Sequence, residues 1–341
     1  MAYMYRHFIP QNTAPTGAKK IGVYNENNEK IYSIPLGRMT PPTKEKLYSF
    51  GLVSDIHISH YTSVSWNPET KFDNALSYFE SKGCALCIAT GDLTNTGFYL
   101  RTDENTAGTE YLDLTQMVKY KAVCDKHTIP VYALSGNHEC YYNQDLTKNL
   151  DKWETYTGQG ASSYAITQGD DLFILLGQSS VSAVVSDEDF NWFSATLAAN
   201  ADKRCFVFVH SYIEEDSGDA GDFRENSIFE YWGTTKRNNF LNLLKQYPNV
   251  ILFHGHSHIK FEWQEGDKSA NYTEKNGFKS VHIPSLCRPR NVDFEAESTP
   301  YVDSESQGYI VDVYDDCIVL NGMDFINEIP VPLGVFRIDT K

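Results

Sequence analysis

Basic residues are scarce in this chain relative to acidic ones. Its 341 residues include 29 lysines and arginines against 45 aspartates and glutamates, which gives a formal net charge of -16 at pH 7. A charge of this sign repels nucleic-acid phosphates and anionic membrane surfaces unless a basic patch offsets it, and the sequence has no such patch. We therefore expect a small ligand as partner, with no nucleic-acid polymer and no membrane.

Long apolar runs are also missing. Residues 1–7 contain no apolar segment of the kind that directs secretion, and no run in the chain approaches the roughly 20 apolar residues of a membrane helix. The seven cysteines form an odd set, and most of them lie in apolar segments where a free thiol packs as a small hydrophobe. These features predict a cytoplasmic protein without a disulfide framework.

Five short polar blocks are present, and each follows an apolar run. The runs are rich in β-branched and aromatic residues, which is typical of buried strands. The runs and blocks are 48–53 before Asp55 and His57, 85–89 before Asp92, 130–134 before Asn137 and His138, 205–209 before His210, and 250–253 before His256 and His258. Because ligands bind beyond the carboxyl ends of parallel strands, we expect these side chains to gather at one edge of a sheet.

Segments with helical periodicity separate the predicted strands. They are 72–81, 111–127, 146–156, 187–200 and 235–246. Strands that alternate with helices predict an α/β fold with largely parallel strands and helices on the outside. The length suits one main domain with a single large core.

The residue types in the blocks indicate a metal site. Imidazole together with carboxylate suits transition ions such as Mn, Fe, Zn or Ni, and no cysteine falls within the blocks. Two ions close together need one bridging carboxylate, for which Asp92 is the natural candidate. Such a pair would activate a shared water for attack on phosphorus, so no side-chain nucleophile is required. We therefore predict two divalent transition-metal ions as cofactors.

In this order the blocks D-x-H, G-D, G-N-H-E, H and G-H-x-H resemble those of the calcineurin-like metallophosphoesterases, from about residue 49 to residue 258. The resemblance implies a four-layer α/β/β/α sandwich with a dinuclear metal site at the carboxyl ends of the strands. It implies one ion on Asp55, His57, Asp92 and His258, and a second on Asp92, Asn137, His210 and His256. It also implies that His138 faces the scissile phosphate and protonates the leaving oxygen as a general acid.

The chain departs from two branches of this family. Purple acid phosphatases have a tyrosine where this chain has Asn95, and usually a glycine where it has His57. Protein Ser/Thr phosphatases carry an aspartate-arginine-glycine sequence that is missing here. What remains resembles the cyclic-nucleotide phosphodiesterase branch, which predicts an enzyme for a small phosphodiester such as a cyclic nucleotide or nucleotide derivative. A phosphomonoesterase, and a structural component of a virion or other assembly that retains the fold, stay open as alternatives.

Residues 1–47 precede the first core strand and form a separate N-terminal arm. Segments 21–24 and 30–35 predict a β-hairpin, and such an arm either caps the core or attaches the protein to a larger assembly. Residues 48–341 are assigned to the metallophosphoesterase domain. Its C-terminal strands are expected to complete the second sheet, and they are 309–314, 317–320 and 335–338.

The loops beyond the strand ends should select the substrate. The long ones at 58–71, 93–109, 140–149 and 211–233 contain aromatic residues suited to packing against a base or another apolar group, and the last is also rich in acids. Arg288 and Arg290 follow a predicted strand at 281–284 and are candidate substrate-binding residues, because guanidinium groups form charge-assisted hydrogen bonds with phosphate. An ion pair with the acidic loop is the alternative.

Overall fold

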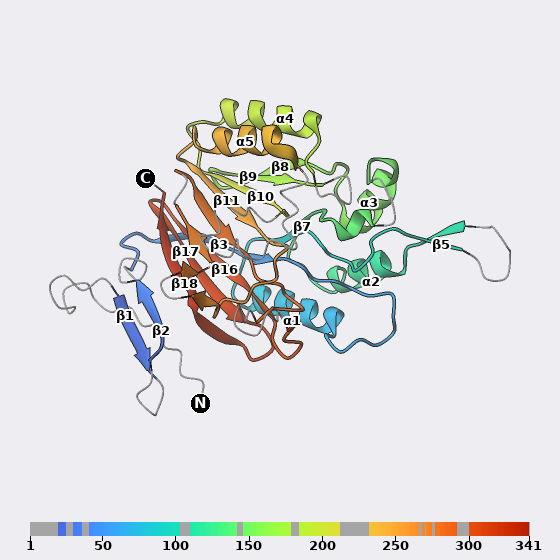
Figure 1. The fold of residues 1–341 in the computed structure, drawn as a ribbon, viewed down its shortest axis with the longest axis horizontal. Helices are drawn as coiled ribbons and strands as arrows, with labels where there is room; N and C mark the ends of the chain where they lie inside the picture. The colour runs from blue at the N-terminus through green and yellow to red at the C-terminus, as the bar shows by residue number, and fades with distance from the viewer. Residues whose placement is uncertain are drawn as a thin grey trace.

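Two six-stranded sheets that face each other form the centre of the molecule (Figure 1). The computed structural model describes residues 20–24, 30–35, 41–102, 110–141, 146–178, 184–211, 232–265, 268–269, 271–274, 277–291 and 300–340. The first sheet has the strand order β18-β17-β16-β3-β4-β7, and the second has the order β14-β15-β11-β10-β9-β8.

The first sheet joins a parallel half to an antiparallel half. The parallel strands are β3 (Lys46–Val53), β4 (Cys87–Thr90) and β7 (Val131–Leu134). The antiparallel strands are β16 (Gln307–Tyr314), β17 (Cys317–Asp324) and β18 (Ile329–Asp339). The expectation that these C-terminal strands complete the second sheet is wrong, because β16 pairs along the edge of β3 that β4 leaves open. An open strand edge carries unpaired backbone groups, which the C-terminal strands satisfy.

The second sheet is parallel in its centre and antiparallel at its two edges. Its central strands are β9 (Asp171–Leu176), β10 (Cys205–Val209), β11 (Val250–His254) and β15 (Lys279–His282). Its edge strands are β8 (Tyr164–Gln168) and β14 (Tyr272–Thr273). Both β10 and β11 are buried along their whole length, which explains why they contain apolar residues on both faces.

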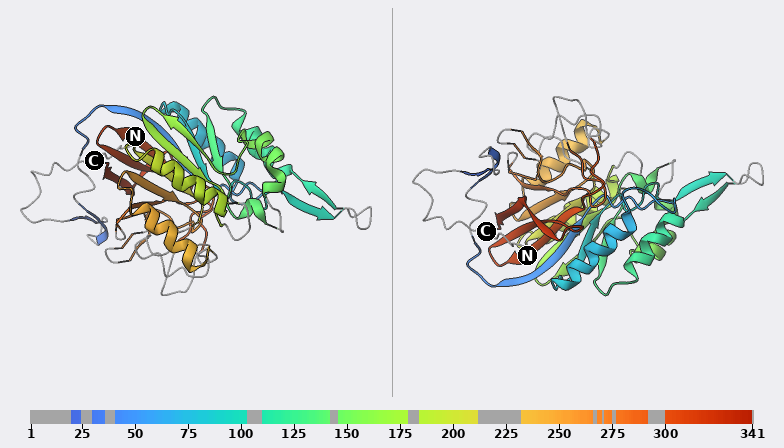
Figure 2. Two further views of the ribbon diagram at one scale, coloured as in Figure 1. Left: turned by 90° about the horizontal axis from the view of Figure 1, so that it is seen from above. Right: turned by 90° about the horizontal axis from the view of Figure 1, so that it is seen from below.

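Helices cover the outer face of each sheet, as Figure 2 shows from opposite sides. Those on the first sheet are α1 (Pro68–Ser81), α2 (Thr115–Cys124) and α3 (Leu150–Thr157), and those on the second are α4 (Asp187–Ala199) and α5 (Gly233–Leu244). The predicted helix at 111–127 is shorter than expected, because residues 110–113 pair with residues 99–102 as a hairpin. The predicted helix at 146–156 begins as the 3-10 turn η4 (Leu146–Asn149).

A cluster of aromatic rings fills the space between the two sheets. Phe50 of the first sheet contacts Phe173 and Phe206 of the second, with ring centroids 5.1 and 5.6 Å apart. Separate apolar clusters lie between each sheet and its helices. Three apolar interfaces between four layers confirm the α/β/β/α sandwich.

Short elements complete the described chain. They are β5 (Tyr99–Thr102), β6 (Glu110–Asp113), η3 (His138–Cys140), β12 (Gln264–Glu265) and β13 (Lys268–Ser269). At the N-terminus β1 (Lys20–Tyr24) pairs antiparallel with β2 (Lys30–Pro35), which confirms the predicted hairpin. Within the described residues this hairpin joins neither six-stranded sheet.

Candidate metal centre

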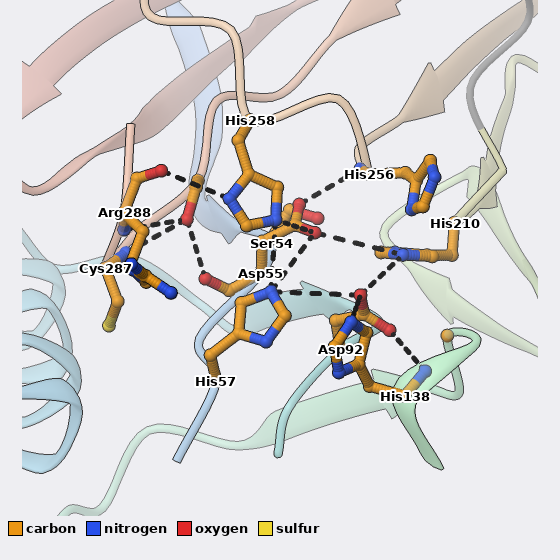
Figure 3. Close-up of polar contacts among 12 residues, drawn as sticks. Ser54, Asp55, His57, Asp92, His138, His210, His256, His258, Cys287 and Arg288 are labelled. Carbon is orange, nitrogen blue, oxygen red and sulfur yellow. Dashed lines mark hydrogen bonds and ion pairs between the residues drawn. The ribbon is translucent and has the colours of Figure 1, made fainter. Parts of the chain in front are cut away.

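Residues from both sheets meet at the predicted site (Figure 3). The loops after β3, β4 and β7 supply residues from the first sheet, and the loops after β10 and β11 supply residues from the second. Seven side chains form three overlapping groups, within each of which the potential ligand atoms lie within 4.8 Å of one another. They are Asp55, His57, Asp92, His138, His210, His256 and His258. The remaining predicted ligand, Asn137, directly precedes His138.

The backbone is strained at most of these positions. Seven described residues other than glycine have φ in the left-handed region, and five of them belong to the site. They are Asp55 (54°), His57 (52°), Asp92 (48°), His256 (70°) and His258 (61°). A left-handed conformation costs a residue with a side chain about 1–3 kcal/mol, and such strain concentrates at functional sites. Alternate residues of one loop, such as Asp55 and His57, thereby present their side chains to the same centre, while Ile56 between them packs in the core.

The first group consists of Asp55, His57 and His258. The Nε2 atoms of His57 and His258 are 3.0 Å apart, and His258 Nε2 lies 3.1 Å from Asp55 Oδ1. His258 Nδ1 donates a hydrogen bond to the carbonyl oxygen of Arg288 at 3.1 Å, so in neutral His258 the Nε2 atom carries a lone pair. Two ring nitrogens this close need a cation or a shared proton between them.

The second group consists of Asp92, His210 and His256. His210 Nε2 lies 3.1 Å from Asp92 Oδ2, and His210 Nδ1 donates to the carbonyl oxygen of Thr90 at 2.8 Å. A backbone carbonyl that holds one ring nitrogen orients the other toward a metal, as metal-bound histidines require. Beside this group, Asn137 Oδ1 is buried and accepts no hydrogen bond from any residue the structure describes. An oxygen in this position fits a metal ligand.

Asp92, a member of the second group, also lies close to the first. Its Oδ2 atom is 3.1 Å from His210 Nε2 and 3.8 Å from His57 Nε2, and its Oδ1 atom accepts a hydrogen bond from the backbone N–H of His138 at 2.9 Å. The same carboxylate belongs to the third group, with His57 and His138. Asp55 Oδ1 also lies 3.8 Å from His210 Nε2, but Asp55 belongs to one group and Asp92 to two, so of the two aspartates Asp92 has the position that a bridging ligand needs.

His138 stands at the edge of the cluster. Its Nδ1 atom donates to the carbonyl oxygen of Asn95 at 2.6 Å, and its Nε2 atom lies 3.7 Å from Asp92 Oδ2. The ring contacts His57 edge to face, with centroids 4.5 Å apart. The hydrogen bond to Asn95 fixes the ring so that Nε2 faces the site, where it can hold a proton.

Electrostatics favour a cation in this cluster. Burial alone would raise the pKa values of Asp55 and Asp92, but the neighbouring imidazoles hold both pKa values below the usual range. Burial lowers the pKa of His210, yet Asp92 and Asp55 outweigh it and raise that pKa to about 9. Burial and the charge of His210 lower the pKa of His256 to about 3. Two buried carboxylates and nearby imidazoles with lone pairs are a donor set that fits divalent ions.

Glu139 supports the site without belonging to the ligand groups. Its carboxylate accepts hydrogen bonds from the backbone N–H groups of Thr94 at 3.0 Å and Gly136 at 2.8 Å. It thus ties the loop that follows Asp92 to the loop that carries Asn137. Burial, followed by the charge of Asp92, raises the pKa of Glu139 to about 7. Glu139 is the last residue of the G-N-H-E block, and this supporting role was not predicted from the sequence.

Arg288 and Arg290 lie next to the first group. The Arg288 guanidinium stacks between Trp66 and Tyr301, with its carbon 4.5 and 3.8 Å from the ring centroids, and its Nε lies 3.7 Å from Asp303 Oδ1. Arg290 donates a hydrogen bond to the Tyr301 hydroxyl at 2.5 Å. Among the described residues, the carboxylate that pairs with Arg288 is therefore that of Asp303. Residues 212–231 of the acidic loop lie outside the described residues.

Comparison with known proteins gives the family. A family model for calcineurin-like phosphoesterases matches residues 48–260, which is more than half of the chain, and the protein belongs to this family. The family implies divalent metal ions and a phosphoesterase activity. Among curated proteins, no sequence match was found.

Solved structures share the fold at low sequence identity. A dimetal phosphatase from Danio rerio superimposes with a TM-score of 0.59 and 13% identity, covering 87% of this chain and 100% of that chain. A purple acid phosphatase from yellow lupin seeds has a TM-score of 0.56 and 14% identity, covering 94% of this chain and 59% of that chain. The protein GAP50, the anchor in the inner membrane complex of Plasmodium, has a TM-score of 0.54 and 12% identity, covering 86% and 89%.

Among the residues that the structure describes, no helix is both long enough and apolar enough to cross a bilayer.

Proposed function

We propose that the protein is a metal-dependent phosphodiesterase for a small substrate. One divalent transition-metal ion would be held by Asp55, His57, Asp92 and His258, and a second by Asp92, Asn137, His210 and His256. When bound, such ions supply Lewis-acid polarisation of the phosphoryl group and activation of water. The observation that carries the proposal is the position of Asp92, whose Oδ2 atom lies 3.1 Å from His210 Nε2 of the second group and 3.8 Å from His57 Nε2 of the first.

The protein's own residues have distinct roles in this proposal. The carboxylate of Asp92 keeps the two groups together, and the backbone N–H of His138 holds that carboxylate in place. With Nδ1 donating to Asn95, the His138 side chain acts as an imidazolium that gives its Nε2 proton to the leaving oxygen and becomes neutral. The carbonyl oxygens of Thr90, Asn95 and Arg288 fix the ring orientations of His210, His138 and His258.

The preference for a diester rests on the sequence of the metal-binding loops. Asn95 stands where purple acid phosphatases have a tyrosine, and His57 stands where they usually have a glycine. His57 is part of the first group in the structure, which supports a site without a phenolate ligand. A cyclic nucleotide or another nucleotide derivative is the proposed substrate, and a phosphomonoester is the alternative.

Metal analysis and an ester panel test this function. The purified protein should contain about two transition-metal ions per chain, and it should hydrolyse bis(4-nitrophenyl) phosphate faster than 4-nitrophenyl phosphate. Faster turnover of the monoester would support the phosphatase alternative. A protein that takes up no Mn, Fe, Zn or Ni, and hydrolyses neither ester in their presence, would refute the proposal.

We also propose that residues 1–47 attach the protein to a larger assembly in the cytoplasm. The β1–β2 hairpin pairs with neither core sheet among the described residues, which leaves its strand edges available for a partner. All seven cysteines have free thiols, which supports a reducing compartment. Deletion of residues 1–40 should leave ester hydrolysis intact while it reduces the size of the native assembly in gel filtration. An unchanged elution volume, after correction for the lost mass, would argue against the attachment role.

A further inference from the structure

Two arginines and two aromatic rings form a stacked ladder beside the metal centre. In the order of contact it consists of Trp66, Arg288, Tyr301 and Arg290, and we call it the arginine ladder. The guanidinium carbon of Arg290 lies 4.5 Å from the centroid of the Tyr301 ring. Stacking on rings orients a guanidinium group but uses none of its N–H donors, so those donors can still bind an anion.

A buried lysine fixes the two segments that carry the ladder. Lys71 of α1 is only 3% exposed, and its ammonium group donates to the carbonyl oxygens of Cys287 (2.6 Å), Asp303 (2.8 Å) and Glu305 (2.7 Å). Burying a charged group is costly unless it is hydrogen-bonded, and these acceptors meet that need. The segments next to Arg288 and Tyr301 are therefore held in place before any ligand binds.

The ladder has more positive than negative charge. Asp303 pairs with Arg288 and is itself held by the Ser65 hydroxyl at 2.5 Å. Among the described residues, Arg290 forms no ion pair within 4.0 Å, and its one hydrogen bond from the side chain goes to the neutral Tyr301 hydroxyl. Within the part of the chain that the structure describes, two guanidinium groups thus face one carboxylate, in a chain whose net charge is -16. This local excess of positive charge suits one further anionic group.

The ladder adjoins one side of the metal centre. Trp66 Nε1 donates to the carbonyl oxygen of His57 at 3.2 Å, and the carbonyl oxygen of Arg288 accepts from His258 Nδ1. Figure 3 places Arg288 on the opposite side of the cluster from His138. A leaving group protonated by His138 would therefore point away from the ladder, and the group that stays on phosphorus would point toward it.

We infer that Arg288 and Arg290 bind a second anionic group on the retained part of the substrate, separate from the phosphate that is cleaved. This inference rests on the proposed phosphodiesterase function and names its substrate class, which is a phosphodiester whose retained group bears a further phosphate. Guanidinium groups match phosphate because they offer several N–H donors in one plane.

A pair of esters with the same leaving group tests this. Thymidine 5′-(4-nitrophenyl phosphate) and its 3′-phosphorylated form both release nitrophenol, and they differ by one phosphate on the retained nucleoside. The 3′-phosphorylated ester should have a KM about tenfold lower, the usual effect of a charge-assisted hydrogen bond. In Arg290→Gln and Arg288→Gln, measured separately, the ratio of the two KM values should approach 1. Lys126→Gln removes one positive charge from an exposed lysine whose ion pair is with Asp73 and not with a ladder residue, and it should keep the wild-type ratio.

Binding of the products gives a readout that needs no turnover. Thymidine 3′,5′-bisphosphate should bind about tenfold tighter than thymidine 5′-monophosphate by calorimetry, and Arg290→Gln should abolish the difference. Equal KM values and equal affinities in the wild type would overturn the inference while the diesterase function stands. So would a preference that survives in both arginine variants. If neither ester is hydrolysed, the proposed function fails, and the affinity ratio alone decides the inference.

Discussion

Replacement of His138 by alanine separates its acid role from its structural contacts. The side chain contributes one hydrogen bond from Nδ1 to the carbonyl oxygen of Asn95 and a ring contact with His57. The contact that positions Asp92 comes from the backbone N–H of His138, and alanine keeps it. We therefore expect His138→Ala to fold, to lose about 1 kcal/mol of stability with the hydrogen bond, and to retain both metals.

Its effect on catalysis should depend on the leaving group. Loss of a general acid lowers kcat by about 10² to 10⁴, which corresponds to roughly 2.7 to 5.4 kcal/mol of transition-state stabilisation. We expect this loss for a diester with an alkoxide leaving group, which needs a proton as the bond breaks. For a nitrophenyl diester, whose leaving group is stable as an anion, the loss should be about tenfold or less.

The assay compares kcat for the two diesters in wild type and His138→Ala, with metal content measured on the same samples. His138→Gln serves as a matched variant, because it keeps polarity and much of the volume but cannot act as a general acid. Equal losses on both diesters would show that His138 positions the site and donates no proton. Loss of metal from the alanine variant would instead make His138 a ligand, as its group with His57 and Asp92 allows.

The remaining predictions concern the metals and the packing around them. Asp92→Ala should lower the content of both metals by elemental analysis, and retention of two ions would contradict the bridging role. In the fold the pKa of His210 is raised to about 9, against 6.5 for an unperturbed histidine. This shift stabilises the metal-free fold fully below pH 6.5, and the contribution is lost as the pH rises toward 9. Metal binding displaces that proton, so affinity should rise between pH 7 and 9 with proton release in calorimetry, and a flat profile would refute this. Gly136→Ala should destabilise the protein by about 1–3 kcal/mol in denaturant titration, because its Cβ would collide with the Asp92 carboxylate and backbone; unchanged stability would mean that the loop can move. Lys71→Met should lower the free energy of unfolding by about 3 kcal/mol, because the carbonyl oxygens of Cys287, Asp303 and Glu305 lose their donor. A neutral effect would mean that water replaces the ammonium group.

The sequence was sufficient to predict the strands that carry the polar blocks. Residues 205–209 and 250–253 are apolar throughout, which indicates buried strands. His210 directly follows the first run and His256 lies just beyond the second, which indicates ligand positions at the strand ends. Strand β9 is just as buried, but the residues at 177–180 that follow it contain no histidine or carboxylate, and the strand was not predicted. The C-terminal strands were recognised, but strand composition carries no information about which sheet edge they join.

Some features around the site could not be predicted from the sequence, because they depend on tertiary contacts. Lys71 lies within the sequence of α1 like any exposed helix lysine, and its three carbonyl partners come from residues more than 200 positions away. The stacking of Tyr301 on Arg288 likewise depends on how two loops meet. The left-handed backbone of Asp55 and His256 is also invisible in the sequence, because aspartate and histidine tolerate that region without requiring it.

The division of the site between the two sheets has a consequence for the whole molecule. His57 and His258, 201 residues apart in the chain, come from different sheets and present their Nε2 atoms to one point. An ion bound there would cross-link the two halves of the sandwich, much as a disulfide closes a long loop, in a chain whose seven thiols are all free. Chelators would then act on this protein as reducing agents act on a secreted one. The lifetime of the folded chain in the cell would follow its supply of metal.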